Sequence, residues 1–159
     1  MYLTKGEVMN EIKRTERGWP GHFIMGHRCS FRRNTLLEND DTKIIVSTVG
    51  AMPLNQNHDA EALGFKESDS GFETIGYKRY YETMAFHAIQ EGPYLEADVG
   101  REVSFESPWS IDYISNSADN DANDMHEAAV SEIIERMQKG EIKNATDPSS
   151  QSASTKTQD

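Results

Sequence analysis

An apolar residue returns at every fourth position near the C-terminal end of the chain, and this pattern constrains the fold more than any other. The repeating positions are Met125, Ala129, Ile133 and Met137. Side chains at this spacing lie on one face of an α-helix. Asn120 or Asp121 can cap such a helix, and Gly140 is a typical stop residue. We therefore predict an amphipathic helix over about residues 121–139 that buries one face against another layer.

Short segments rich in β-branched and aromatic residues precede this helix and predict strands. Residues 43–49 (KIIVSTV) are the clearest, and Gly50 ends them. Residues 22–37 predict two strands or one bulged strand, because apolar residues there are interrupted by Gly26. Further strands are expected within residues 75–89 and 101–106, with turns at residues 38–41 and 90–93.

The N-terminal segment predicts a second, shorter helix. Thr4-Lys5-Gly6-Glu7 is a capping box, and apolar residues follow it at helical spacing, so we expect a helix over about residues 5–16. The order helix, strands, helix predicts an α+β fold with a mostly antiparallel sheet, the N-terminal short helix and the C-terminal helix packed on one face. Only that face of the sheet is then required to be apolar. We expect residues 1–143 to form a single domain.

The last segment, residues 144–159, is predicted to be a disordered polar tail. After Asn144 it contains no apolar residue larger than alanine, so burial has nothing to offset the entropy lost on ordering. A chain ending at residue 144 is therefore expected to keep the melting temperature of the full chain. Thermal unfolding of the two chains tests this, and a fall of more than a few degrees would show that the tail is docked.

Charge is strongly sorted along the chain. Residues 13–33 carry six basic side chains against one acidic, whereas residues 91–135 carry twelve acidic side chains against one basic. The second segment alone therefore accounts for the net charge of −11. Such an asymmetry steers charged partners. It argues against general nucleic-acid binding, which needs a basic domain, and allows binding to a basic protein surface.

Two features of the sequence indicate the cellular compartment. The single cysteine, Cys29, excludes an internal disulfide and is typical of a reducing compartment. The chain contains no apolar run near the roughly 20 residues of a membrane helix, and its N-terminus lacks the apolar core of a signal peptide. We expect a cytoplasmic protein that does not bind membranes.

A zinc site or a cysteine nucleophile has to be weighed because His22, His27 and Cys29 lie close together in sequence. Their spacing fits no closed zinc motif, and the fourth ligand would have to come from elsewhere. A nucleophilic Cys29 would need His87 or His126 beside it as a base. The simpler interpretation is a buried thiol with hydrogen-bonded histidines. We predict no metal, no cofactor and no catalytic residue.

Residues 119–124 (DNDAND) resemble the start of a calcium-binding loop but fail at two positions. The sixth should be glycine and is Asp124, and the twelfth should be glutamate and is Val130. These residues are better interpreted as a cap cluster at the start of the C-terminal helix.

Arginine and tyrosine residues in two of the predicted strand segments suggest an anion site. Guanidinium groups hold phosphate or carboxylate, and tyrosine rings stack on bases. The alternative is that the arginines neutralise acids of the chain itself and the tyrosines pack in the sheet. The residues of this alternative anion site are Arg28, Arg32, Arg33, Tyr80, Tyr81 and His87.

Five stretches together carry a resemblance to a known family. They are residues 17–23 (RGWPGHF), 31–37 (FRRNTLL), 45–50 (IVSTVG), 80–86 (YYETMAF) and 123–127 (NDMHE). Over about residues 17–135 the chain resembles a family of small, uncharacterised acidic proteins carried by phages and other mobile elements. The family has no assigned activity, so no residue role is transferred. The resemblance implies a context in which small acidic proteins block host defence, CRISPR effectors included, by occupying a nucleic-acid-binding surface.

Three functional hypotheses follow. The first is a non-enzymatic inhibitor whose carboxylates face a basic groove on a host protein. The second is a small nucleotide- or phosphate-binding protein or enzyme built on the arginine, tyrosine and histidine set. The third is a homo-oligomer in which the basic segment of one copy meets the acidic segment of another. The acidic surface of the first hypothesis is Glu106, Asp112, Asp119, Asp121, Asp124 and Glu127.

Overall fold

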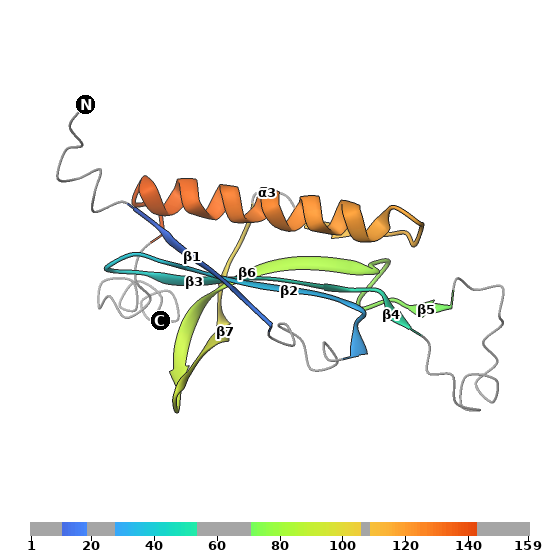
Figure 1. Ribbon diagram of the computed structural model, residues 1–159, viewed down its shortest axis with the longest axis horizontal. Helices are drawn as coiled ribbons and strands as arrows, with labels where there is room; N and C mark the ends of the chain where they lie inside the picture. The colour runs from blue at the N-terminus through green and yellow to red at the C-terminus, as the bar shows by residue number, and fades with distance from the viewer. Residues whose placement is uncertain (1–10, 19–27, 54–70, 106–108, 143–159) are drawn as a thin grey trace, which may run out of the picture.

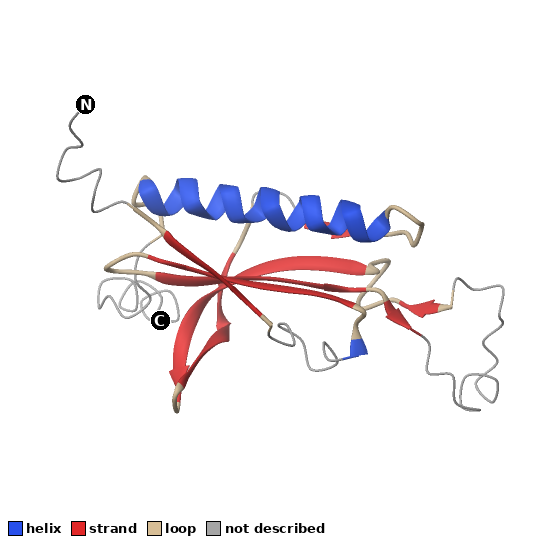
Figure 2. Ribbon diagram, viewed as in Figure 1, coloured by secondary structure: helices blue, strands red, loops and turns tan. Residues whose placement is uncertain are grey.

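One long helix lies across one face of an antiparallel sheet (Figures 1 and 2). A computed structural model of the chain describes residues 11–18, 28–53, 71–105 and 109–142. The helix, α3 (Ala118–Gln138), follows all the strands in sequence. The predicted α+β architecture, a mostly antiparallel sheet with a C-terminal helix on one face, is confirmed.

Antiparallel pairing joins every neighbouring pair of strands in the main sheet. The order is β1 (Lys13–Arg17), β2 (Phe31–Glu38), β3 (Lys43–Gly50), β6 (Tyr81–Glu91) and β7 (Tyr94–Val103), with β8 (Trp109–Ile111) paired to the first residues of β6. Two short strands, β4 (Met52–Pro53) and β5 (Phe72–Glu73), form a separate pair. The strand predicted over residues 43–49 is confirmed as β3, whereas the one predicted over residues 101–106 is the end of β7 and stops at Val103.

Tight turns form two of the hairpins where the sequence predicts them. In the β2–β3 turn the Asn39 side-chain oxygen accepts hydrogen bonds from the backbone nitrogens of Asp41 and Thr42, at 2.9 and 2.8 Å. In the β6–β7 turn Gly92 adopts a φ of +58°, which glycine accepts without steric cost. Both turns give direct hairpin connections, which fix the register of the paired strands.

The helix-facing side of the sheet carries the largest apolar cluster. Alternate residues of β2, β3 and β6 point toward α3, so that Leu37, Val46 and Ala85 pack with Ile133 of the helix. The apolar stripe predicted for the helix is confirmed, because Met125, Ala129, Ile133 and Met137 are all buried.

The opposite side of the sheet is buried as well, which the sequence did not lead us to expect. Leu36, Ile45 and Phe86 lie side by side in the register, point away from α3 and are almost fully buried. A register shift between Phe86 and Ala88 accompanies the bend of the β6–β7 hairpin away from the helix (Figure 1). Arg17 of β1 then donates a hydrogen bond of 2.7 Å to the Leu95 carbonyl oxygen of β7, joining the two outer strands on this side.

The boundaries of α3 differ slightly from the prediction. Its N-cap is Ser117, so the helix begins three residues before Asp121, and Asn120 and Asp121 lie inside its first turns. The predicted end is confirmed, since Gly140 follows the C-cap with a φ of +73°. In the described part of the chain, neither α3 nor any shorter helical turn is both long and apolar enough to cross a membrane.

The predicted N-terminal helix is wrong where the structure can be compared with it. Residues 13–16 belong to strand β1, which pairs with β2 so that Thr15 lies opposite Leu36. A capping box is a local preference, and pairing along a sheet edge outweighs it here. Residues 1–10 and the predicted tail, residues 144–159, lie outside the described residues.

Candidate functional site

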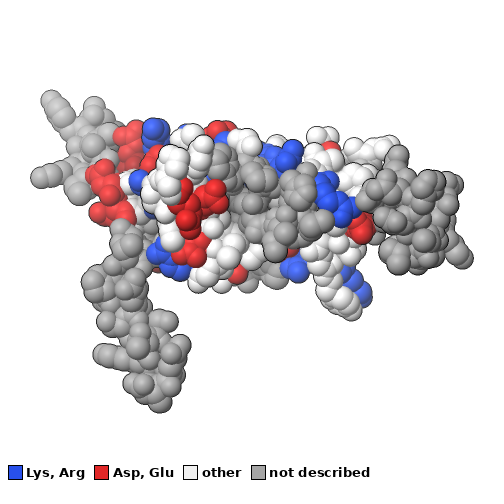
Figure 3. Space-filling model, turned by 90° about the horizontal axis from the view of Figure 1, so that it is seen from below, with Lys and Arg blue, Asp and Glu red and all other residues white. Residues whose placement is uncertain are grey.

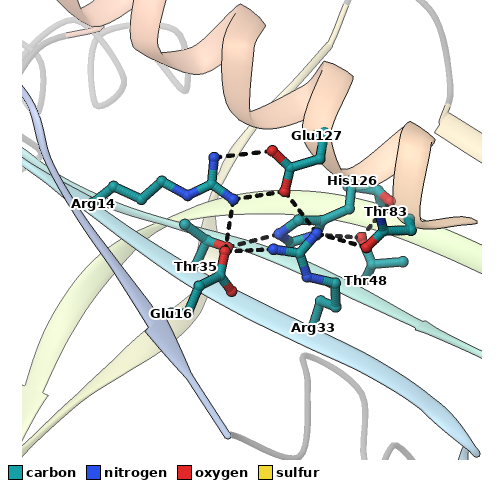
Figure 4. Close-up of polar contacts among 9 residues, drawn as sticks. Arg14, Glu16, Arg33, Thr35, Thr48, Thr83, His126 and Glu127 are labelled. Carbon is teal, nitrogen blue, oxygen red and sulfur yellow. Dashed lines mark hydrogen bonds and ion pairs between the residues drawn. The ribbon is translucent and has the colours of Figure 1, made fainter.

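A fully buried histidine links α3 to three strands. His126 has an exposed fraction of 0%, and its Nε2 and Nδ1 atoms each lie 2.7 Å from a threonine hydroxyl, Thr35 of β2 and Thr48 of β3 respectively (Figure 4). The Thr48 hydroxyl also lies 2.6 Å from that of Thr83 on β6. The Thr35 hydroxyl donates its single proton to Glu16, so it accepts a hydrogen bond from the Nε2–H group of the ring, and the Nδ1 atom accepts one from Thr48.

Burial holds His126 in its neutral form. Loss of hydration is the main cause that lowers the pKa of His126 to about 4, and the positive charge of Arg33 acts in the same direction. A neutral imidazole with both nitrogens bonded to threonines, out of reach of solvent, has no free atom to offer a substrate. We therefore interpret His126 as a structural residue that orients α3 on the sheet.

Beside this histidine, two arginines and two glutamates form a closed ring of ion pairs, Arg14, Glu16, Arg33 and Glu127 (Figure 4). Arg14 lies 2.7 Å from Glu16 and 2.6 Å from Glu127, and Arg33 lies 2.7 Å from Glu127. Glu16 also accepts a hydrogen bond of 2.8 Å from Thr35, which joins the ion-pair ring to the histidine network.

The ion-pair ring keeps its glutamates ionised. The hydrogen bond from Arg14 is the largest of the effects that lower the pKa of Glu127 to about 2, and Arg33 acts in the same direction. Each charge in the ring faces an opposite charge on both sides, so the ring clamps the edge strand β1 to α3. It leaves no guanidinium in this cluster directed at an external anion.

The six residues of the alternative anion site are not brought together. Arg33 belongs to the ion-pair ring, and Arg28 pairs with Glu73 at 2.9 Å. Arg32 points to the opposite face of β2 from its neighbour Arg33. Tyr81 is buried and donates a hydrogen bond of 2.6 Å to Asp119. Arg28 and Arg33 therefore neutralise acids of the chain itself, and Tyr81 packs in the fold, as the alternative interpretation of these residues predicts.

The two remaining residues of that set also lie apart. Tyr80 is half-buried in the chain segment next to Ile111. His87 lies six residues beyond Tyr81 along β6, roughly 20 Å at the rise of a strand. Burial lowers the pKa of His87. No common pocket therefore gathers these side chains in the described structure.

Cys29 is not positioned for nucleophilic catalysis with His126. The thiol is buried with Val49 and Met52, burial raises its pKa, and both ring nitrogens of His126 are bonded to threonines. His22 and His27 lie outside the described residues. Among those that are described, no group of three histidine, cysteine or acidic residues is arranged to hold a metal ion.

The predicted acidic surface divides into two parts. Glu127 is held in the ion-pair ring, and Glu106 lies outside the described residues. The other four gather where α3 begins, and we call them the acidic end: Asp112, Asp119, Asp121 and Asp124. The Tyr81 and Tyr113 hydroxyls donate to Asp119 and Asp121 respectively. No Lys or Arg in the described ranges lies within ion-pair distance of these four carboxylates.

Helix geometry favours the two carboxylates at the start of α3. Asp119 and Asp121 lie in the first turn of α3, where the positive end of the helix dipole stabilises negative charge. Asp112 and Asp124 are exposed to solvent. Elsewhere the charges are mixed: on the face of the sheet away from α3, acidic and basic side chains both appear (Figure 3).

The histidine network and the ion-pair ring were not predicted. His126 lies next to Met125 and four residues before Val130, on the edge of the apolar stripe. Helical spacing could therefore have predicted that it is buried. Its threonine partners come from strands about 80 and 90 residues earlier, and no local pattern joins them.

Comparison with family models, with curated proteins and with solved structures found no match to this chain.

Proposed function

We propose that this chain is a small, acidic, non-enzymatic binding protein of phage or mobile-element origin that acts in the cytoplasm. It inhibits a host nucleic-acid-binding protein of the defence or CRISPR type by presenting carboxylates to a basic groove. The observation that carries this proposal is the acidic end, where four aspartates on or near the first turns of α3 have no cation partner among the described residues. Carboxylates in such a group occupy positions that phosphates take in a basic groove.

The distribution of the basic residues supports the proposal. Most of the described cations are already paired with acids of the same chain, and these are Arg14, Arg28, Arg33, Lys43, Arg79, Arg101, Arg136 and Lys139. The surplus of acids responsible for the net charge of −11 is therefore not neutralised at the acidic end. A surplus of one sign at one end of a molecule orients it during encounter with a partner of opposite charge.

The interior supports a binding role over an enzymatic one. The buried polar groups of His126, Thr35, Thr48 and Thr83 satisfy one another, and the ion-pair ring is closed. An active site needs titratable groups that converge on a space which a substrate can enter. In the described residues the arginine, tyrosine and histidine set of the second hypothesis is dispersed, so we do not propose a nucleotide or phosphate site. Homo-oligomer formation stays a prediction.

Binding is expected to depend on Asp112 and Asp124, the two exposed aspartates of the acidic end that do not bond a tyrosine. The double variant Asp112→Asn/Asp124→Asn removes two charges without touching the carboxylates that bond Tyr81 and Tyr113. Against the host protein captured from lysate, it should associate about tenfold more slowly at low salt, because steering of a basic partner weakens. Stopped-flow association at low and high salt measures this, and salt should weaken the wild type more than the variant.

The matched control is Asp40→Asn/Asp41→Asn, which removes two charges from the β2–β3 turn. These residues are exposed and lie at the end of β3 remote from the acidic end. The control variant is expected to associate at nearly the wild-type rate. Equal slowing by both double variants would mean that net charge alone acts, and no slowing by either, with no effect of salt, would rule out the proposed surface.

A further inference from the structure

The most exposed large hydrophobic side chain of the described structure is an aromatic ring on a tight turn. Tyr77 has an exposed fraction of 83% and lies between Gly76 and Arg79, which form an isolated β-bridge. The Ile75 nitrogen donates to the Arg79 carbonyl oxygen at 2.7 Å, and the Arg79 nitrogen donates to the Gly76 carbonyl oxygen at 3.2 Å. The turn therefore has a defined shape and holds the ring away from the core.

Two residues of this turn adopt arrangements that a plain connection would not need. Lys78 has a φ of +54°, a left-handed conformation that costs a residue other than glycine about 1 kcal/mol or more. Its ammonium nitrogen lies 5.4 Å from the centre of the Tyr77 ring. A Cβ atom on Gly76 would lie 2.5 Å from an Arg79 side-chain nitrogen, so glycine is required for the guanidinium to pack there.

The turn is attached firmly to the sheet. The Tyr80 nitrogen donates to the Ile111 carbonyl oxygen of β8 at 2.8 Å, and the Ala51 nitrogen donates to the Tyr80 carbonyl oxygen at 3.0 Å. Because the backbone of the turn is held, the Tyr77 ring has only its own side-chain torsions to fix when it meets a partner, and aromatic side chains with few rotatable bonds dominate the energy of protein interfaces.

An open groove of about 600 Å³ lies beside the turn, and it is lined by Tyr77, Lys78, Arg79, Ser110 and Asp112. Asp112 lines this groove, so one carboxylate of the acidic end lies beside the exposed ring. Lys78, whose ammonium nitrogen lies beside the ring, repels a cation at that point. A basic partner that meets the aspartates must therefore present an apolar recess, not a charge, to Tyr77.

We propose that Tyr77 is the anchor residue of the partner interface and inserts into an apolar recess flanked by basic residues on a protein surface. This inference rests on the function proposed above and adds the chemistry of the partner. The aspartates of the acidic end provide charge complementarity, and the ring provides buried apolar contact.

Two fluorescein-labelled peptides of about twelve residues, measured by fluorescence anisotropy against the full chain, separate these contributions. Both carry the same number of lysines and arginines with glycine and serine spacers, and one has a central pair of spacers replaced by leucines. Both should bind in a salt-dependent manner, and the leucine pair should tighten binding about tenfold because it packs on the Tyr77 ring. In Tyr77→Ala that gain should disappear, while binding of the leucine-free peptide stays unchanged.

Tyr94→Ala serves as the matched control. Tyr94 is 55% exposed and lies at the far end of β6 from the Tyr77 turn, so its removal should leave the gain intact. Salt-dependent binding without a leucine gain, or a gain that survives in Tyr77→Ala, would overturn the anchor and leave the proposed function standing. If neither peptide binds the wild type at low salt, the proposed function fails, and the anchor with it.

Discussion

Ile133→Ala is expected to lower the free energy of unfolding by about 2–5 kcal/mol, because it removes a buried side chain and leaves a cavity. Ile133 has an exposed fraction of 0% and packs with Leu37, Ile44 and Val46 across the interface between α3 and the sheet. The neighbouring strands are hydrogen-bonded on both sides, so the backbone there has little freedom to close the space. Urea denaturation of the variant and the wild type measures the difference.

The adjacent residue provides the control. Glu132 is half-exposed and pairs with Arg136 one turn later at 3.3 Å, a helix-surface pair that contributes little. Glu132→Ala should therefore cost under about 0.5 kcal/mol. Equal losses in the two variants would mean that α3 does not face the sheet with the stripe that contains Ile133.

Acidification is expected to destabilise the protein through His126. The pKa of His126 is about 4 in the folded chain against an ordinary value of 6.5, so the unfolded state binds more protons between these two values. The stability that comes from keeping the ring neutral is fully present above about pH 6.5 and is lost as the pH falls toward 4. From pH 7 to 4.5 this group alone should remove about 2 kcal/mol from the free energy of unfolding.

Denaturation of wild type and His126→Gln at several pH values between 7 and 4.5 tests this assignment. The glutamine variant should be less stable at pH 7, yet its stability should fall less steeply with pH. His87→Gln is the matched control, since burial lowers the pKa of that half-buried histidine less strongly and its loss should remove less of the slope. An unchanged slope in His126→Gln would contradict a buried, neutral His126.

The ion-pair ring acts in a separate range of pH. The pKa of Glu127 is lowered from 4.5 to about 2, so its stabilising effect is present above about pH 4.5 and is lost as the pH falls toward 2. This window lies below that of His126, and the two contributions are therefore distinguishable in one series of denaturation curves.

Local periodicity was sufficient to predict the elements that bury a continuous apolar pattern. The stripe through Met125 and Ile133 repeats at the period of a helix, and residues 43–49 are β-branched and short. These patterns depend only on neighbours in sequence, so they predict α3 and β3 from the chain alone. The positions of the β2–β3 and β6–β7 turns follow from the same kind of information, because Asn39 and Gly92 favour turn conformations through their own chemistry.

Pairing across the sheet decided what local preference could not. Residues 13–16 follow a capping box and were predicted to be helical, yet they form β1 because β2 offers hydrogen bonds along its whole edge. The two-residue period of β2 then places Arg33 toward α3 and Arg32 away from it. The arginines of the predicted arginine and tyrosine site therefore point to different faces of the sheet. The strand register that separates them depends on contacts between segments distant in sequence.

The candidate site, too, could be predicted from the sequence only in part. Composition alone determined that the chain carries a surplus of acids and that they concentrate between residues 91 and 135. Only the tertiary structure decided which of them remain without a cation partner, because Arg14 and Arg33 reach Glu127 from strands that approach α3 in space, not in sequence. The exposure of Tyr77 was likewise decided by the tertiary structure. Its exposure depends on a turn that the backbone of β8 and the residue after β3 hold in place, and hydrogen bonds between such distant segments leave no periodic trace in the sequence.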